Sequence, residues 1–180
     1  MKKIAFLFPG QGSQAPGMGR DLFEKNDAAR AVFEKSRGVL DIDIAAICFE
    51  GTADDLKKTE NTQPALYLVS AAANAALRAA GFAPAAVAGH SLGEYSALAA
   101  AGWIRFEDGL KIVRERGLLM AASDPEGKGT MAAVLGLPRA TVDAAIAPLA
   151  SRGVIQVAND NSDEQIIISG EKTLLKDAEA

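Results

Sequence analysis

The sequence has one cysteine and one histidine among its 180 residues, and each scarcity excludes a kind of site. Cys48 alone cannot form an internal disulfide, which is typical of a protein from a reducing cytoplasm. We expect Cys48 to be a small buried apolar residue, and we expect no metal site. His90 is the only imidazole that could act as a base within these residues.

Excess positive charge and long apolar runs are also missing. The formal net charge is −4, which argues against nucleic-acid binding, because neutralising phosphates requires a basic face. The apolar run Ile4–Phe8 ends at Pro9, short of the roughly 7–15 residues of a signal-peptide core. Polar residues interrupt Ala65–Ala80, so it predicts a buried helix. We expect a soluble cytoplasmic protein with no nucleic-acid or membrane partner.

Residues 1–125 alternate between strand and helix patterns. Residues 4–8 predict a fully buried strand, followed by a loop over 9–17 that is rich in glycine and proline. A second strand is predicted around Val87. Helices are predicted over 21–40, 44–49, 54–58, 63–80, from about 92, and over 108–122. This alternation predicts a large α/β domain with three layers and a parallel sheet.

A different pattern begins after residue 125. Strands are predicted over 130–137, 153–158 and 165–169, and helices over 138–150 and from 171 onward. A polar turn over 159–164 separates the last two strands. The order β-α-β-β-α is one strand short of a ferredoxin-like unit. We therefore predict a small, incomplete ferredoxin-like α+β subdomain over 126–180.

The most informative motif is Gly-His-Ser-Leu-Gly at residues 89–93. It follows an apolar strand and precedes a helix-forming stretch, the context of a nucleophile elbow. Gly89 and Gly93 would let the strand and helix pack closely, which exposes the hydroxyl of Ser91. The backbone N–H groups from Leu92 onward would lie at a helix N-terminus, where they can stabilise an oxyanion. The motif predicts acyl transfer through a serine ester.

The same residues permit a simpler interpretation. Ser91 and Glu94 also fit Ser-x-x-Glu, the capping box that opens many helices. A cap does not require glycine on both sides of the serine, and Gly93 would cost about 1 kcal/mol in a helix. The two glycines favour the elbow.

Three further segments carry possible chemistry. The loop around Gly10 and Gly12 formally fits a dinucleotide fingerprint, but no strand ending in an acidic residue follows it. Such a loop can instead lend a backbone N–H to an oxyanion hole. Arg114 and Arg116 point to different sides of one helix, so we expect one to be solvated and the other to reach a cleft. The amides of residues 159–161 could bind a ligand or close a turn.

Together the motifs resemble the N-terminal part of the malonyl-CoA:acyl-carrier-protein transacylases. The resemblance covers essentially the whole chain. The matching segments are Phe8–Gln14, Thr62–Ala65, Gly89–Ala97, Arg116-Gly117, and Asn161-Ser162 with Gln165. The family transfers a malonyl group from coenzyme A to the phosphopantetheine thiol of acyl carrier protein, in fatty acid biosynthesis. It implies no tightly bound cofactor, a coenzyme A thioester as substrate, and a monomeric full-length enzyme.

The resemblance also implies roles for single residues. Ser91 would carry the malonyl ester, and the backbone N–H groups of Gln11 and Leu92 would form the oxyanion hole. Arg116 would hold the malonyl carboxylate with both arms of its guanidinium. A leucine after the serine accompanies malonyl substrates in this family, so Leu92 agrees with that choice.

The remaining roles concern the surroundings of the serine. Gln63 would lie near the site among the substrate-binding residues. Asn159 or Asn161 would line the groove for the acyl and pantetheine groups. Adjacent side chains at such a turn diverge, so we do not expect His90 to act as the base for Ser91. The resemblance implies that His90 serves the architecture of the site.

The sequence departs from the family in one respect. The family's general base is a second histidine further along the chain, and these 180 residues contain none. We expect the sequence to be part of a longer enzyme, impaired when alone. Two alternatives stay open: a serine esterase, which the elbow permits equally, and a non-catalytic module that binds acyl carrier protein or coenzyme A.

Overall fold

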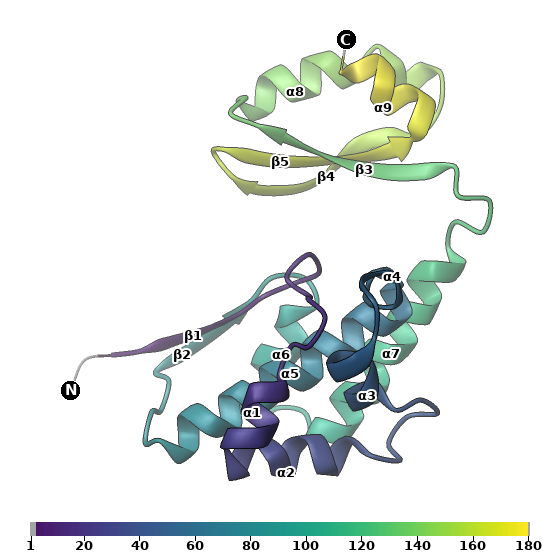
Figure 1. Cartoon of the computed structure of the whole chain (residues 1–180). Helices are drawn as coiled ribbons and strands as arrows, with labels where there is room; N and C mark the ends of the chain where they lie inside the picture. Colours follow the sequence, from purple (N-terminus) through teal and green to yellow (C-terminus); the bar gives the residue numbers. More distant parts are fainter. Residues whose placement is uncertain (1–2, 180) are drawn as a thin grey trace. The chain divides into compact units, whose positions relative to one another are not determined.

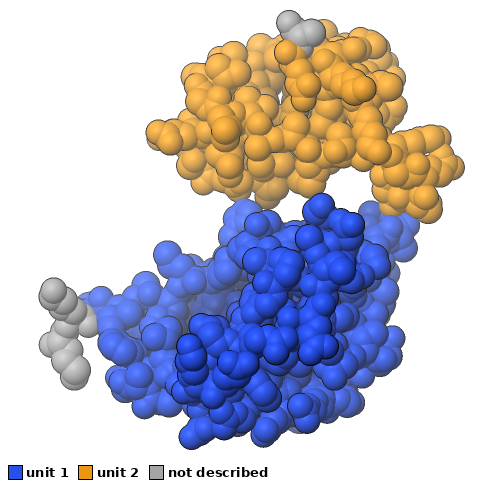
Figure 2. Space-filling model, viewed as in Figure 1, with its two compact units in different colours: residues 1–123 blue, residues 124–180 orange. Residues whose placement is uncertain are grey.

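A computed structural model describes residues 3–179 and divides them into two compact units. The first unit ends at Ser123 and the second begins at Asp124 (Figure 2). Each unit has its own sheet and its own buried apolar residues. No helix within residues 3–179 is long and apolar enough to cross a membrane.

The first unit contains a parallel pair of strands. β1 (Ala5–Phe8) pairs with β2 (Ala86–Gly89), with Ala5 opposite Ala86 and Phe8 opposite Gly89, and the two lie side by side in Figure 1. Parallel strands require a long crossover, and here it contains five helices. These are α1 (Arg20–Lys25), α2 (Asp27–Ser36), α3 (Ile44–Glu50), α4 (Ala53–Lys57) and α5 (Thr59–Ala79). Two helices follow β2: α6 (Gly93–Ala100) and α7 (Phe106–Ala122). The predicted α/β class with a parallel sheet is confirmed.

Helix α5 lies at the centre of the first unit. It contacts α2, α3, α6 and α7, and its residues Ala65, Leu68 and Ala72 are fully buried. Cys48 packs in the same cluster, as predicted for a small apolar residue. Burial raises the pKa of the Cys48 thiol to about 12, so it stays protonated and unreactive at neutral pH.

The prediction of a fully buried first strand is wrong for the described residues. Phe6 and Phe8 are buried, whereas Leu7 between them is 77% exposed. The reason is that α6 covers one face of the two-stranded sheet, where both phenylalanines pack against Ala97 and Ala100. A strand with one covered face buries only alternate side chains.

Two predicted helices have different limits in the structure. The helix predicted over 21–40 is interrupted at Asn26, which has extended backbone angles, and its side chain accepts a hydrogen bond from the Ala29 N–H at 2.9 Å. Asparagine is a good N-cap because its amide oxygen satisfies a donor of the first turn, and so α2 begins anew. Helix α5 starts at Thr59, four residues earlier than predicted, and contains Pro64.

The second unit is a three-stranded antiparallel sheet with helices. Its strands β3 (Gly129–Leu135), β4 (Ile155–Ser162) and β5 (Gln165–Glu171) are ordered β3-β5-β4. The helical elements are α8 (Arg139–Ile146), the 3₁₀ helix η1 (Leu149–Ser151) and α9 (Lys172–Ala178). Val142 and Ile146 of α8 and Leu174 of α9 form one buried apolar cluster with Ile166 and Ile168 of β5. The predicted order β-α-β-β-α is found; the ferredoxin-like assignment and the missing strand stay predictions.

The predicted polar turn over 159–164 is wrong in its extent. Strand β4 continues to Ser162, and Asn159 and Asp160 pair with Ile167 and Ile166 of β5. The pairing is irregular on both sides of this segment. Because β4 is an edge strand and bulges are common there, it accommodates consecutive polar residues that look like a turn in sequence.

Candidate active site

Ser91 lies in the sharp turn between β2 and α6. Its φ is +52°, and it is the only non-glycine residue with a positive φ in the described part of the chain. This left-handed conformation is strained for a residue with a side chain, and strained residues cluster at functional sites. It is also the geometry by which a nucleophile elbow presents its hydroxyl, and Ser91 is exposed.

The two glycines beside Ser91 have no space for side chains. A Cβ atom on Gly89 would overlap the carbonyl group of Gly93, four residues later. A Cβ atom on Gly93 would overlap the carbonyl of Phe8 on the neighbouring strand and lie 2.9 Å from the Pro9 oxygen. The strand, the turn and the helix therefore pack backbone against backbone, which supports structural roles for Gly89 and Gly93.

The capping-box interpretation is wrong. Helix α6 has no side-chain cap, and the Glu94 N–H donates to the backbone oxygen of Ser91 at 3.1 Å. The Ser91 hydroxyl oxygen instead accepts a hydrogen bond from Nη2 of Arg116 at 3.0 Å. The hydroxyl thus belongs to a polar cluster above the turn.

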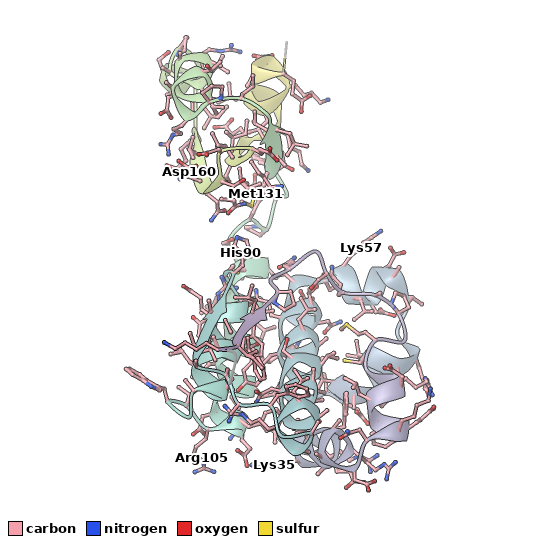
Figure 3. The ribbon with its side chains drawn as sticks, turned by 90° about the vertical axis from the view of Figure 1, so that its left-hand side faces the viewer. Lys35, Lys57, His90, Arg105, Met131 and Asp160 are labelled. Atoms are coloured by element: carbon pink, nitrogen blue, oxygen red, sulfur yellow. The ribbon has the colours of Figure 1, made fainter. Side chains whose placement is uncertain are left out.

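The loop after β1 lies directly against the elbow. The His90 N–H donates to the Phe8 oxygen at 3.1 Å, and a Cβ on Gly10 would be 2.7 Å from the His90 oxygen. That same Cβ would be 3.0 Å from Nδ1 of His90, so the imidazole lies over the backbone of the loop. Figure 3 shows His90 at the carboxyl end of β2. These contacts fit the predicted architectural role of His90.

Gln11 and Leu92 are held in place on the two sides of this contact. Gln11 follows Gly10 directly, and its side-chain Nε2 donates to Oγ1 of Thr59 at 3.2 Å. Leu92 is 1% exposed and lies immediately before α6, where the Gly93 and Glu94 N–H groups donate to the His90 and Ser91 oxygens at 2.9 and 3.1 Å. The contact between loop and elbow brings both backbones to one end of the sheet. Their role as an oxyanion hole stays a prediction.

Arg116 extends from α7 and connects two other predicted site residues. Its Nη2 donates to the Ser91 hydroxyl, and its Nη1 donates to Oε1 of Gln63 at 2.6 Å. The guanidinium carbon also lies 5.9 Å from the centre of the Tyr95 ring, within the range of a cation–π contact. The structure thus brings together the predicted nucleophile, the predicted carboxylate clamp and Gln63.

Gly117 explains how α7 comes close enough for this contact. A Cβ at Gly117 would lie 2.7 Å from the Cα of Glu60 and 2.9 Å from the Thr59 oxygen. The two helices therefore touch backbone to backbone at the first turn of α5. This close approach sets Arg116, the preceding residue, within reach of Gln63.

The expectation that one of the two arginines is solvated is wrong. The side chain of Arg114 is only 13% exposed, and its Nη1 donates to the Glu60 oxygen at 2.8 Å. Pro64 has no N–H, so it cannot donate to Glu60, its normal partner in the helix. Arg114 satisfies this carbonyl instead and joins α7 to α5.

Two residues of the cluster were missed in the sequence. Tyr95 lies beneath the guanidinium of Arg116, and Sδ of Met120 accepts a hydrogen bond from Nε2 of Gln63 at 3.1 Å. Met120 lies four residues beyond Arg116 on α7, and helical residues four apart share a face, so this spacing could have found Met120. Ser91 lies in the turn before α6, so helical spacing gives no such signal for Tyr95.

The two predicted asparagines belong to the second unit. Asn159 pairs with Ile167 in the edge strand, and Nδ2 of Asn161 donates to Oε1 of Gln165 at 3.0 Å. Their predicted role in a substrate groove stays a prediction. Among residues 3–179, no group of three or more His, Cys, Asp or Glu side chains could hold a metal ion.

Comparison with known proteins identifies relatives that share both sequence and fold. Malonyl CoA-acyl carrier protein transacylases are 44% identical over 171 residues in Bacillus subtilis (strain 168) and 48% identical over 176 residues in Staphylococcus aureus (strain COL). The matches cover 94% and 97% of this chain, but only 54% and 56% of those proteins. The chain thus spans about half the length of the curated relatives it matches.

Solved structures give the same result. The malonyl CoA-acyl carrier protein transacylase of Clostridium perfringens superposes with a TM-score of 0.92 at 42% identity, covering 98% of this chain and 56% of that one. A malonyl-transacylase in complex with a type II polyketide synthase acyl-carrier protein also gives 0.92, at 39% identity, covering 98% and 58%. The sequence model of the acyl transferase domain family matches residues 5–178 of this chain. With elbow, fold and sequence in agreement, the chain belongs to the acyl transferase domain family, and its resemblance to the malonyl-CoA:acyl-carrier-protein transacylases is confirmed.

Proposed function

We propose that this chain provides the nucleophile and the carboxylate-binding group for malonyl transfer from malonyl-CoA to acyl carrier protein. The observation that carries the proposal is the 3.0 Å contact between Nη2 of Arg116 and the Ser91 hydroxyl. A cation within reach of the nucleophile suits an acyl group that has its own carboxylate. The names of the relatives support this reaction class.

The transfer takes place in two steps. The Ser91 oxygen attacks the thioester carbonyl as a base takes its proton, the C–S bond breaks, and coenzyme A takes up that proton and leaves as the thiol while the malonyl ester forms. The phosphopantetheine thiol of acyl carrier protein then loses its proton and attacks this ester, the ester C–O bond breaks, and the serine oxygen takes up the proton. In both steps the N–H groups of Gln11 and Leu92 would stabilise the tetrahedral oxyanion. The carboxylate of the malonyl group would bind Arg116 and hold the acyl group in place.

The serine proton needs a base. His90 lies over the loop backbone at Gly10, as described above, so we assign it an architectural role. We propose that the general base is not among these 180 residues. General base catalysis contributes roughly 10²–10⁴-fold, so the chain alone should transfer malonyl slowly.

The coenzyme A thioester serves as substrate, and no cofactor is needed. The solved complex of a malonyl-transacylase with an acyl-carrier protein supports acyl carrier protein as the acceptor here. Asn159 and Asn161 would line the groove for the acyl and pantetheine groups. We also propose a cytoplasmic enzyme that is monomeric at full length.

A serine esterase is the main alternative, and Arg116 distinguishes the two. An esterase for neutral esters has no need of a cation beside the serine. Arg116→Ala should reduce acylation of Ser91 by malonyl-CoA about tenfold to a hundredfold, because a charge-assisted bidentate contact is lost. Unchanged hydrolysis of neutral esters by the same variant would favour the esterase.

The main test is intact-protein mass spectrometry after incubation with malonyl-CoA. The assay compares this chain with the same chain joined to the remaining sequence of the Bacillus subtilis relative. We expect one malonyl adduct on Ser91, formed much faster in the longer protein, and none in the Ser91→Ala control. A longer protein that is folded but acquires no adduct would contradict the proposal.

A further inference from the structure

We propose that Gln63 is a positioning residue for malonyl selection, which acts through Arg116 without touching the substrate. The inference rests on the proposed function and specifies how that site distinguishes a malonyl from an acetyl group. Gln63 lies on α5, is fully buried, and carries the acceptor for Nη1 of Arg116. A fully buried side chain is suited to holding a neighbour in place.

The amide of Gln63 has a fixed orientation. Arginine offers only donors, so the group facing its guanidinium has to be the carbonyl oxygen of the amide. The NH₂ end then points at the Met120 thioether, a weak acceptor, at 3.1 Å. Reversing the amide would place donor against donor at Arg116. The amide orientation that gives the 2.6 Å contact with Arg116 is therefore the one that suits both Arg116 and Met120.

The guanidinium is held from three directions. Gln63 accepts from Nη1, Ser91 accepts from Nη2, and the face of Tyr95 lies 5.9 Å from the guanidinium carbon. Gln63 is the only fully buried partner among the three, and its contact is independent of the acyl group, whereas Ser91 becomes an ester during transfer. Gln63 is thus the anchor that keeps the fork of Arg116 in place when the serine is acylated.

The neutrality of Gln63 is as important as its shape. An amide oxygen accepts a hydrogen bond from Arg116 and leaves the positive charge available for a substrate carboxylate. A glutamate at this position would form an ion pair with Arg116 and compete with that carboxylate. An acetyl group has no carboxylate, so its binding should not depend on the charge at residue 63.

The experiment measures binding of malonyl-CoA and acetyl-CoA to the full chain by calorimetry. In Gln63→Glu we expect malonyl-CoA to bind about tenfold or more weakly, and acetyl-CoA to change less than about twofold. In Gln63→Leu the anchor is lost without added charge. We expect a smaller loss of malonyl preference, and altered side-chain NMR signals of Arg116 before any ligand is added.

Thr62→Val is the matched control. Thr62 is fully buried on the same helix, and its Oγ1 donates to the Leu56 oxygen at 2.5 Å, with the Lys58 oxygen at 3.0 Å. This variant should lower the melting temperature but leave the ratio of malonyl-CoA to acetyl-CoA affinity unchanged.

Two results would overturn the inference in distinguishable ways. If the Gln63 variants lose stability as Thr62→Val does but keep the malonyl preference and the Arg116 signals, Gln63 is merely structural and the proposed function stands. If the unaltered chain binds acetyl-CoA as well as malonyl-CoA, the proposed function fails, and the role of Gln63 fails with it.

Discussion

Ser91 combines a strained backbone conformation with an exposed side chain. Its φ of +52° is maintained because Gly89 and Gly93 let the strand and helix come into backbone contact. The turn therefore depends on two residues that take no part in the chemistry. Their importance for the fold can be measured separately from catalysis.

Replacing Gly93 by alanine should destabilise the first unit strongly. Its Cβ would overlap the Phe8 carbonyl, and backbone cannot move aside as a flexible side chain can. We expect a loss of roughly 3 kcal/mol or more in the free energy of unfolding, at the upper end for overpacking. Urea denaturation measures this loss.

Gly38→Ala is the matched control for Gly93→Ala. Gly38 has a φ of +73°, and an added Cβ there would meet no atom within 4 Å, so alanine at this position meets backbone strain and no clash. We expect a cost of about 1–2 kcal/mol. Equal losses in the two variants would show that the close contact at Gly93 is unimportant.

At the scale of elements, the site depends on how α7 meets the first turn of α5. Gly117 allows the two helices to come close. Arg114 stabilises their contact by donating to the Glu60 oxygen, which has no N–H partner at Pro64. The helix pair thereby fixes the position of Arg116, although neither Arg114 nor Pro64 touches Ser91.

A double-mutant cycle tests this link. Arg114→Met keeps the aliphatic stem and should cost about 1–3 kcal/mol, since it leaves the Glu60 carbonyl unsatisfied. Pro64→Ala restores a backbone N–H for that carbonyl, so Arg114→Met should cost less in this background. Urea denaturation of the four proteins gives the coupling free energy. Additive losses would contradict the proposed compensation.

The order of strands and helices can largely be predicted from the sequence, by apolar periodicity and by the loops rich in glycine and proline. Gly89 and Gly93, two residues on either side of Ser91, identify the elbow. The half-exposed β1 could not be predicted, because an apolar strand looks the same whether one or two of its faces are covered. The last residues of β4, 159–162, look like a turn in the sequence for a similar reason: composition does not reveal strand pairing.

The site was predictable where a residue type implies its chemistry. Ser91 is predicted in this way, whereas the choice of Arg116 over Arg114 comes from the family resemblance, because residue type alone leaves both arginines open. The contact between Gln63 and Arg116 could not be predicted, because it joins residues 53 positions apart through the packing of two helices. Sequence spacing within one element carries no information about such a contact.

At the scale of the molecule, the joint between the units begins with a carboxylate. Asp124 accepts hydrogen bonds from the N–H groups of Lys128 at 3.0 Å and Gly129 at 2.7 Å. These bonds, that of Gly129 first, lower the pKa of Asp124. They tie the start of the second unit to strand β3.

The lowered pKa predicts loss of stability in acid. A depressed folded-state pKa stabilises the fold fully above the unfolded value of about 3.9, and the effect disappears as pH falls through the folded-state pKa. Asp124→Asn should therefore flatten the pH dependence of unfolding below about pH 4. Amide hydrogen exchange in β3 provides the measurement. An unaltered pH profile in the variant would show that Asp124 does not contribute.

The absence of a second histidine from these residues predicts chemical rescue. Added imidazole should accelerate malonylation of Ser91 in the chain alone by about tenfold or more, since it supplies a base. His90→Ala should retain this rescue, and Ser91→Ala should acquire no adduct. If His90→Ala instead abolishes the basal rate, His90 is the base after all.

The compensation between Pro64 and Arg114 also has a consequence for sequence variation. A helix that lacks one N–H needs an outside donor, and a chain with an ordinary residue in place of Pro64 does not. Positions 64 and 114 should therefore change together among relatives of this chain: proline with arginine, other residues without that constraint. Such paired changes would alter the contact between α5 and α7 next to Arg116 without changing Arg116 itself.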